Sequence, residues 1–389
     1  MIEIRPVSDR AGLRSFVDLP PVIYAGLPGF EPPLRMDRDM LLNPRQSAFW
    51  KHGKVQYWLA LRGGKPVGRI SAQIDPNLPV GIPEGAGMFG SLDAVDDPEV
   101  VRLLIEAAEQ WLADQGCTSI FGPCTLDMND EPGLLVSGAD QPAMTLCPWH
   151  PPYLGPHVER CGYAGLRDLH NWRLDLKEAP LMSSEGRKRL AERIPGLTSR
   201  TPDRGSYARD IAILCDVYND GWREHWGFIP LNPVDLDGLD VLMKWLVAPE
   251  AFRIVELDGE PVGVMLLIPN LFELTAGLSP SPGLAGWPRL VWRALTHRFR
   301  SGRIIVVGLV SRLQGTVIGS AIAALMVDEL VASQTVLKGE WVEAGWVLEN
   351  NTALIQILER FRFRRNKTFR IFGKSLDGAM PRQAMETVE

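Results

Sequence analysis

Two stretches of the chain decide its fold: YWLALRGGKPVGRISAQIDPN at residues 57–77 and FRIVELDGEPVGVMLLIPN at residues 252–270. Each stretch reads as an apolar strand, a two-residue turn that ends in glycine, and a second strand that opens with Pro-Val-Gly. The turns Gly63-Gly64 and Asp258-Gly259 suit the positive φ angles of tight hairpins. Because the turns lie 195 residues apart (residues 64 and 259), the repeat indicates a duplicated domain.

The segments around the two hairpins follow a similar order. The first copy predicts strands at 2–6, 87–93, 118–122 and 168–176 and helices at 10–26 and 98–115; the second predicts helices at 184–193, 207–224, 235–247, 318–334 and 351–361 and strands at 303–310, 339–348 and 367–373. This order predicts an α/β fold (α+β mixed sheet) of two tandem modules, each a mostly antiparallel sheet flanked by helices. We place the modules at residues 1–178 and 179–389.

The composition is that of a globular protein long enough for two domains, with 46% hydrophobic and 23% charged residues in 389. A net charge of −6 argues against nucleic acid as a partner. The five cysteines form no CxxC pair and the histidines show no metal-ligand spacing, so we expect no metal and a reducing compartment. The N-terminus does not read as a signal peptide, and no uninterrupted apolar run is long enough to span a bilayer. We expect a cytoplasmic protein.

A glycine-bearing turn, Ser311-Arg312-Leu313-Gln314-Gly315-Thr316-Val317-Ile318-Gly319, joins the strand ending at Val310 to a long helix. Free backbone N–H groups and the helix dipole at such a turn favour a pyrophosphate. Gly315 and Gly319 leave room for the ligand to approach the backbone. A turn that needs glycine only for packing is the alternative.

The turn and the segment that follows it resemble the GNAT acyltransferase superfamily. Arg312-x-x-Gly315-x-Val317 resembles its pyrophosphate loop, and the segment from Asn351 to Phe363 resembles its element beside the pantetheine. The resemblance implies acyl-CoA as co-substrate, with no permanently bound cofactor. It implies CoA contacts at Val310, Arg312, Gln314, Gly315, Thr316, Val317, Ile318, Gly319 and Asn351. The first copy instead carries Asp93, Asp96 and Asp97 after its strand, and three carboxylates oppose phosphate binding.

Acyl transfer to an amine needs a base for the amine proton. We predict Glu343 as this catalytic base, because it lies between Trp341 and Trp346, where apolar surroundings raise a carboxyl pKa. The alternative is a carboxylate paired with an arginine. His225 is the second catalytic candidate, and its alternative is a histidine packed among aromatic rings at a helix end.

The acceptor is expected to contact polar and aromatic side chains near these candidates. We predict substrate-binding roles for Asn219, Trp222, Trp226, Asn129 and Trp346. Asn219 and Trp222 lie one helical turn apart, and Asn129 follows an apolar strand in a polar loop. For Asn219 and Trp222, capping and packing are the alternatives; for the loop with Asn129, a turn whose side chains bond their own backbone.

Nearly the whole chain resembles a GNAT family that includes bacterial ceramide synthases. The resemblance is carried by Phe89-Gly90-Ser91, Gly122-Pro123, Asn129–Leu134, Asp168-Leu169, Tyr218–Phe228 and Glu343–Asn351. It implies N-acylation of a long-chain sphingoid base by a fatty acyl-CoA, by direct transfer in a ternary complex. Two alternatives stay open: an N-acetyltransferase acting on a small amine, amino acid or peptide with acetyl-CoA, and a non-catalytic acyl-CoA-binding regulator.

The segment PRLVWRALTHRFRSGR at residues 288–303 mixes Trp and Leu with arginines in an otherwise acidic chain. Such an amphipathic segment suits a lipid headgroup interface. We therefore expect peripheral contact with the cytoplasmic face of the inner membrane. A solvated helix with ordinary arginines is the alternative. The oligomeric state stays open.

Overall fold

The computed structural model of the chain describes residues 1–45, 47–203, 205–232, 248–336 and 338–376. It contains two compact units, each made of separate stretches of chain. The first unit is Met1–Leu169, Leu274–Trp292 and Lys367–Glu389, and the second is His170–Glu273 and Arg293–Asn366. These units differ from a division into residues 1–178 and 179–389. The helix predicted at 235–247 lies outside the described residues.

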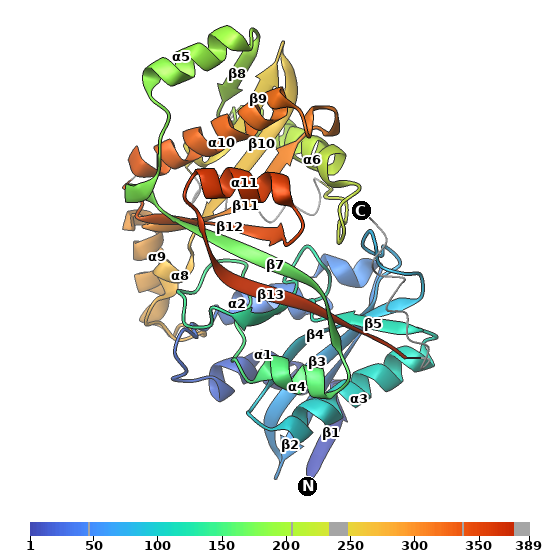
Figure 1. Cartoon of the computed structure of the whole chain (residues 1–389). Coiled ribbons are helices and arrows are strands. Elements are labelled where there is room, and N and C mark those ends of the chain that lie inside the picture. The colour runs from blue at the N-terminus through green and yellow to red at the C-terminus, as the bar shows by residue number, and fades with distance from the viewer. Residues whose placement is uncertain (46, 204, 233–247, 337, 377–389) are drawn as a thin grey trace. The chain divides into compact units, whose positions relative to one another are not determined.

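The first unit contains a mixed sheet with helices (Figure 1). Its elements are β1 (Ile2–Pro6), α1 (Arg10–Ile23), α2 (Arg35–Leu42), β2 (Lys54–Arg62), β3 (Lys65–Ile74), β4 (Ala86–Ala94), α3 (Pro98–Asp114), β5 (Ser119–Gly122), β6 (Leu134–Ser137) and α4 (Leu154–Arg160), with the 3₁₀ turn η1 (Ala48–Lys51). Strands β1 to β4 pair antiparallel in chain order, and β4 pairs parallel with β5. The fold class predicted from the sequence is confirmed here.

Helix α3 shows how local sequence positions an element of this sheet. Asp97 caps it by accepting a hydrogen bond from the Glu99 N–H, and Pro98 occupies the first turn, where no N–H is needed. Its apolar side packs on β3 at Gly68, where a Cβ would lie 2.8 Å from side-chain atoms of Val100 and Leu104. Glycine at this position therefore lets helix and strand approach closely.

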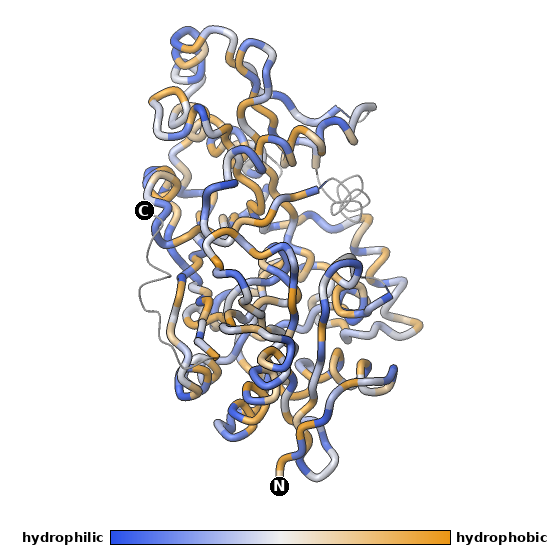
Figure 2. Tube along the Cα trace, turned by 90° about the vertical axis from the view of Figure 1, so that its right-hand side faces the viewer, coloured by the Kyte–Doolittle hydropathy of each residue, from blue (hydrophilic) through white to orange (hydrophobic). Residues whose placement is uncertain are grey.

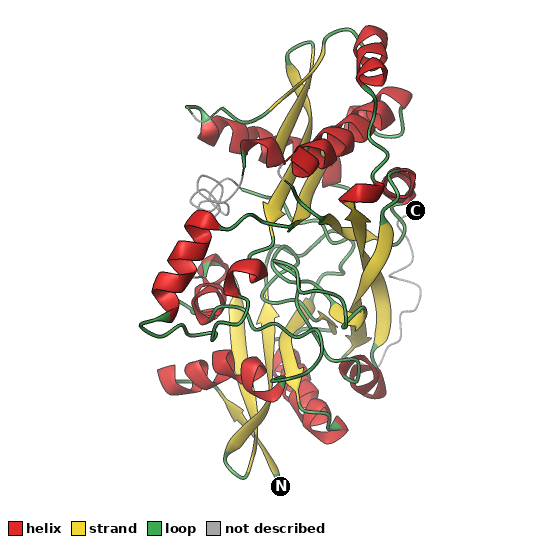
Figure 3. Cartoon of the chain, turned by 90° about the vertical axis from the view of Figure 1, so that its left-hand side faces the viewer, coloured by secondary structure: helices red, strands yellow, loops and turns green. Residues whose placement is uncertain are grey.

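The second unit repeats the pattern of a hairpin followed by a strand, a helix and a strand. Its elements are η2 (Leu176–Glu178), α5 (Ser184–Arg193), β8 (Leu197–Arg200), α6 (Tyr207–Trp222), η4 (Pro249–Ala251), β9 (Phe252–Leu257), β10 (Glu260–Pro269), β11 (Ser301–Leu309), η5 (Ser311–Leu313), α10 (Val317–Val336), β12 (Trp341–Leu348) and α11 (Thr352–Arg360). The strand order is β12-β11-β10-β9-β8. Helices line the strands of both units (Figure 3).

The chain changes unit inside four elements: β7 (Ala164–Asp175), α8 (Phe272–Thr275), α9 (Gly286–Thr296) and β13 (Arg364–Ser375). Consequently the last strand of the chain completes the first sheet, where Phe372 pairs with Gly122 of β5. The C-terminal end of β7 belongs to the second unit, where the Leu176 N–H donates to the Glu340 carbonyl. The sequence predicted both strands but not this exchange between the units.

The two sheets share an irregularity in the strand that follows each hairpin. β4 carries an extra residue between Gly90 and Asp93, and β11 carries one between Ile304 and Val306. Such a bulge bends a strand and often lies beside a functional site. Because it recurs at matching places, the bulge extends the internal repeat from sequence to structure.

Helix α10 is long and apolar. Its window Val317–Gln334 passes the length and composition test for a membrane span, and 56% of that window is buried. Ile322, Met326 and Leu330 are fully buried in the core of the second unit. Hydrophobic and hydrophilic residues are mixed along the trace of both units (Figure 2). α10 therefore packs as a core helix here.

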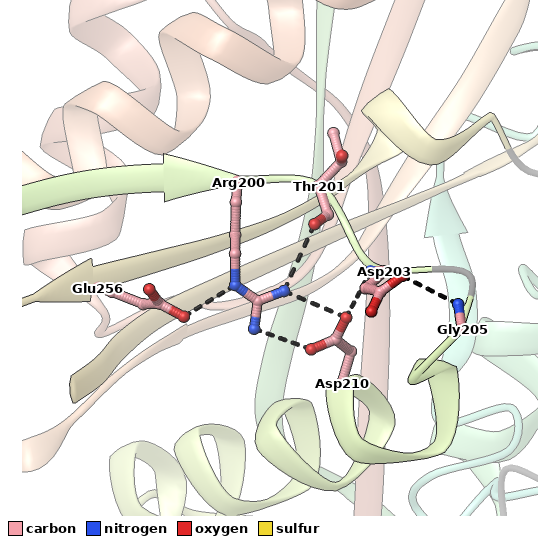
Figure 4. Close-up of polar contacts among 6 residues, drawn as sticks. All are labelled: Arg200, Thr201, Asp203, Gly205, Asp210 and Glu256. Atoms are coloured by element: carbon pink, nitrogen blue, oxygen red, sulfur yellow. Dashed lines mark hydrogen bonds and ion pairs between the residues drawn. The ribbon is translucent and has the colours of Figure 1, made fainter. Parts of the chain in front are cut away.

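An arginine network fixes α6 to the sheet edge (Figure 4). Arg200 at the end of β8 donates two hydrogen bonds to the Asp210 carboxylate, at 2.8 and 3.1 Å, and one to Glu256 of β9 at 2.8 Å. Asp210 also accepts from the Asp203 N–H at 2.7 Å. The network therefore sets the start of the helix whose far end carries the aromatic candidates.

Candidate active site

The parallel strands β11 and β12 of the second unit separate partway along their length. They pair from Ser301↔Trp341 to Ile304↔Ala344, and the pairing ends there although the strands run on to Leu309 and Leu348. β11 stays paired with β10 on its other side. Beyond Ile304 and Ala344 the two strands therefore no longer pair with each other.

The turn after β11 leaves backbone N–H groups without hydrogen-bond partners in the described part of the chain. The backbone N–H groups of Gly315, Val317 and Ile318 donate no hydrogen bond within the described residues. Thr316 caps α10, because its hydroxyl accepts from the Gly319 N–H at 2.9 Å. Free N–H groups at the start of a long helix attract phosphate oxygens, as does the positive end of the helix dipole.

The other predicted CoA contacts in this turn divide into structural and accessible groups. The Gln314 amide donates to the carbonyls of Gly221 and Leu309, so it holds the turn in place. The Val310 N–H is bonded to Val262 in the sheet. Arg312 is exposed and forms an ion pair with Glu260 at 2.8 Å, so its guanidinium could exchange that partner for a phosphate.

Gly315 and Gly319 differ in the space around their backbone. Gly315 has φ +70° and nothing within 4 Å of a Cβ, so its backbone is open to a ligand. At Gly319 a Cβ would lie 1.9 Å from the Leu313 carbonyl oxygen, so only glycine fits. Val317, by contrast, is 87% exposed. The packing role expected as the alternative thus applies to Gly319 but not to Gly315.

One residue that sequence reasoning missed already binds to this turn. The Asp220 carboxylate accepts from the Ser311 N–H at 2.6 Å and from its hydroxyl at 3.1 Å. These hydrogen bonds lower the pKa of Asp220. The Ser311 donors are therefore taken by a protein carboxylate, and the donors left free in the turn, among the described residues, are the later N–H groups of Gly315, Val317 and Ile318.

Glu343 lies on β12 with no solvent exposure. Its carboxylate accepts hydrogen bonds from the side-chain amides of Asn171 at 2.7 Å and Asn366 at 2.8 Å, each on a different oxygen. Arg303, which is 1% exposed, is the register partner of Glu343 on β11, and its guanidinium lies 4.1 Å from the centre of the Trp346 ring. The structure thus places a buried carboxylate where the two strands begin to separate.

Asn171 approaches the backbone of β12 very closely. A Cβ on Gly345 would lie 2.0 Å from the Asn171 side-chain oxygen. Gly345 therefore lets Asn171 reach Glu343. Sequence reasoning missed Asn171, Asn366 and Arg303, since no local motif marks them and Asn171 lies 172 residues from Glu343.

His225 lies in an aromatic cluster after α6. Its ring is 4.7 Å from that of Trp222, and Trp222 stacks on Tyr218. The His225 Nδ1 atom is buried and has no hydrogen-bond partner among the described residues. Burial lowers the pKa of His225, so the imidazole is neutral near pH 7. The Trp222 indole donates to the Val307 carbonyl of β11 at 2.8 Å, which ties the cluster to the separating strand.

The remaining predicted residues are placed as follows. Asn219 uses both atoms of its amide on the Leu231 backbone, at 2.8 and 2.9 Å, which is the packing role given as its alternative. Trp226 is half-buried beyond the same helix. Asn351 caps α11 by accepting from the Leu354 N–H at 3.1 Å. Asn129 lies exposed in the first unit, after β5, and its N–H donates to Asp127.

The three carboxylates at the end of β4 and in the turn that follows it serve the fold of the first unit. Asp93 pairs with Arg69, Asp96 with His157, and Asp97 caps α3. This turn therefore has acidic side chains and a capping aspartate where the second unit offers free N–H groups. The asymmetry expected from the sequence is present in the structure.

Comparison with known proteins supplies the family. The chain is 35% identical over 378 residues to a bacterial ceramide synthase from Caulobacter vibrioides, covering 96% of this chain and 98% of that protein. It is 32% identical over 377 residues to the protein YghO of Escherichia coli K12, covering 96% and 95%. No protein-family profile matches the chain.

Solved structures show the fold. A tandem GNAT protein from the clavulanic acid biosynthesis pathway aligns with a TM-score of 0.53 at 12% identity, over 98% of this chain and all of that one. A GCN5-related glucosamine N-acetyltransferase region of a fungal multi-domain enzyme aligns with a TM-score of 0.57 at 14% identity, over 96% of this chain and 38% of that one. With its tandem GNAT fold, the chain is an N-acyltransferase that belongs to the family of the bacterial ceramide synthase.

Proposed function

We propose that the second unit transfers a fatty acyl group from acyl-CoA to the amine of a long-chain sphingoid base. The observation that carries this proposal is the set of free N–H groups at Gly315, Val317 and Ile318, at the end of a strand that parts from its neighbour beside Glu343. The turn would hold the CoA pyrophosphate, and the separated strands would receive the pantetheine.

The chemistry is a direct transfer in a ternary complex. The amine nitrogen attacks the thioester carbonyl, the C–S bond breaks, and an amide and free CoA thiol form. A base takes the proton that the amine loses, and the thiolate is protonated as it leaves. Glu343 is our proposed base, and neutral His225 with its unpaired Nδ1 is the second candidate.

An apolar surface under α6 supports a lipid acceptor. The side of β10 that faces α6 carries Val264, Leu266 and Ile268, all buried. The matching positions of β3 in the first unit, counted from the shared Pro-Val-Gly, carry Arg69, Ser71 and Gln73. The interior beneath α6 is thus apolar in the second unit where the first unit has polar groups, which is compatible with a long alkyl chain. The proposed location is the cytoplasm, where fatty acyl-CoA is available.

CoA release decides between the acceptors. The purified chain is mixed with acyl-CoAs of different lengths and with either sphingoid bases or small amines and peptides, and free thiol is followed over time. We expect thiol release with long-chain acyl-CoA only when a sphingoid base is present. Release with acetyl-CoA and a small amine would support the N-acetyltransferase alternative. CoA binding without any release would support a regulator.

Two variants test the catalytic assignment. Glu343→Gln keeps the size of the side chain but removes its basicity, and His225→Ala removes the second candidate. We expect at least one to lower kcat about 100-fold or more, the contribution typical of a general base. Full activity in both variants would remove this site from the mechanism.

A proline tests the pyrophosphate turn separately. Val317 is the first residue of α10 and 87% exposed, so Val317→Pro removes one free N–H at a position where helices accept proline. Loss of a hydrogen bond to a charged group predicts CoA binding about 10-fold weaker by calorimetry. Val317→Ala keeps the N–H and is the control. Equal affinity in both variants would contradict CoA binding at this turn.

A further inference from the structure

Helix α9, residues Gly286–Thr296, is unusual because none of its residues is buried. Its apolar side chains nonetheless face solvent: Leu284 just before it is 99% exposed, and within it Trp287 is 41%, Val291 55%, Trp292 65% and Leu295 77% exposed. Among the tryptophans the structure describes, only Trp287 and Trp292 are exposed. We call these five residues the α9 patch.

The α9 patch is one continuous stripe. Trp287, Val291 and Leu295 follow one another at intervals of four residues, so they share one side of the helix. Monomeric proteins rarely leave clustered apolar groups in water, and such clusters mark a binding surface. The stripe therefore needs an occupant.

The positive charge beside the α9 patch indicates what kind of partner the patch binds. Arg289 within the helix and Arg298 just after it are exposed, and neither forms an ion pair within the described residues. The chain as a whole carries a net charge of −6, so this is a local cationic surface on an acidic protein. Cations flanking exposed tryptophan match an anionic lipid headgroup layer above a hydrocarbon boundary.

The length of α9 determines how the helix would lie on a bilayer. Eleven residues at about 1.5 Å each give roughly 16 Å, half of the ~30 Å hydrocarbon core of a bilayer. The helix cannot span a membrane, but an amphipathic helix of this length can lie in the interface plane with its apolar side inserted.

We propose that the α9 patch, with Arg289 and Arg298, docks the protein on an anionic lipid bilayer. The docking rests on the surface of α9 alone. Its use, to bring a lipid acceptor from the bilayer to the enzyme, rests on the proposed function.

Vesicle co-sedimentation tests the docking with the full chain. The vesicles are pure phosphatidylcholine, or phosphatidylcholine with 30–40% phosphatidylglycerol at about 0.1 M salt, where the Debye length is about 10 Å. We expect binding to the anionic vesicles, weaker binding to the neutral ones, and loss of the difference at about 1 M salt. Absence of binding to anionic vesicles at low salt would overturn the proposal.

Paired variants separate the apolar from the ionic contribution. Val291→Ser with Leu295→Ser should weaken vesicle binding at least 10-fold, whereas Val22→Ser with Met40→Ser, equally exposed apolar residues elsewhere, should not. Arg289→Gln with Arg298→Gln should weaken binding to anionic vesicles only. The matched control changes the exposed Arg10 and Arg14 to Gln. Equal effects of the patch variants and their controls would refute a specific docking surface.

Two further measurements distinguish lipid docking from dimerisation and from a failure of the proposed enzymatic function. If the α9 patch joins two copies of this chain, light scattering will show a dimer that the Val291→Ser and Leu295→Ser changes dissociate, and the lipid proposal is then wrong. Thiol release with a sphingoid base dispersed in detergent should be unchanged by these variants. If a patch variant loses vesicle binding but keeps thiol release, docking is confirmed. If the unmodified chain releases no thiol, only the proposed function is contradicted.

Discussion

The carboxylate of Glu343 is oriented by two asparagines from distant parts of the chain. Asn171 and Asn366 each donate to a different oxygen, so the carboxylate plane is fixed and one side-chain rotamer is selected. Hydrogen bonds to the charged form of a carboxyl lower its pKa, whereas burial raises it. The two asparagines are therefore positioning residues that tune the proposed base.

Asn171→Ala tests this positioning. Without one donor the charged carboxylate is less stabilised, so we expect kcat to fall about 10-fold or more while KM for acyl-CoA stays the same. The acidic limb of the pH–rate profile should move to higher pH, because a hydrogen bond that favours the charged form of the base is lost. Asn350→Ala, at an exposed asparagine of the same unit, is the control. A fall in rate with no movement of the limb would indicate a merely structural role.

Gly345→Ala tests the close approach of Asn171 to β12. The new methyl would meet the Asn171 oxygen at 2.0 Å, so the strand or the side chain must move. We expect the free energy of unfolding, from urea titration, to fall by about 1–3 kcal/mol. Gly283→Ala, where no atom lies within 4 Å of the added Cβ, should change it little. Equal stability of the two variants would show that Asn171 does not hold this place.

The pKa of His225 gives a pH prediction. Burial lowers it below the ordinary value of 6.5, so the folded protein binds this proton less well than the unfolded chain. The resulting stability is fully present above pH 6.5 and is lost as the pH falls through the lowered pKa. Chemical denaturation between pH 5 and 8 should show this loss, and His225→Gln should reduce it. An unchanged slope in the variant would contradict the assignment.

At the residue level, the sequence predicted only those site residues that a local pattern marks. Glu343 was predicted because two tryptophans flank it, and the turn at Gly315 because glycines follow a strand. Asn171 and Arg303 lie on other strands, and their approach to β12 depends on sheet order and register, which short-range patterns do not contain. The predicted acceptor role of Asn219 competes with its bonds to Leu231, which a single sequence does not reveal. Its role stays a prediction.

At the level of elements, long periodic segments and the short strands β1 and β5 were predicted closely, whereas several other short elements were missed. Helices α3, α5 and α10 and both hairpins lie within a few residues of their predicted bounds. The segment at 288–303 was predicted as one amphipathic stretch, yet α9 ends at Thr296 and β11 begins at Ser301. The short elements α2, α4, β6 and β8 were missed, because four to eight residues give little periodicity.

The arginine network of α6 gives an element-level prediction. Asp210 is 1% exposed. Its burial raises the carboxyl pKa, but the hydrogen bonds from Arg200 outweigh this and hold the pKa below its usual value. Asp210→Ala leaves Arg200 without its main partner, and we expect about 1–3 kcal/mol less stability in urea. The exposed pair Arg5–Glu3, broken by Glu3→Ala, should cost at most about 0.5 kcal/mol. Equal losses would show that the network does not anchor α6.

At the scale of the whole molecule, the duplicated units have diverged in their chemistry while keeping the hairpin and the bulge. The first unit fills its turn with acidic and capping side chains, and the second leaves N–H groups free. The sequence indicated this difference through Asp96 and Asp97 against Gly315. The sequence did not indicate that β7 and β13 pass from one unit to the other, because the local pattern of a strand does not show which sheet the strand joins.

A fragment tests the exchange. Residues 1–178 lack β13, so the edge of β5 would be left unpaired and exposed to aggregation. We expect this fragment to be insoluble or to show a broad, non-cooperative thermal transition by circular dichroism. Adding a peptide of residues 364–376 should improve its solubility, whereas a scrambled peptide should not. A soluble fragment with a cooperative transition would show that the first unit closes without β13.

The late arrival of β13 also bears on synthesis in the cell. A ribosome must translate up to residue 375 before the N-terminal sheet can pair with β13. The edge of β5 in the nascent first unit therefore stays unpaired while roughly 200 further codons are translated. Contacts between such distant positions form slowly and leave a vulnerable intermediate. From the order of the strands we therefore expect folding in the cell to depend on chaperones and on the speed of translation.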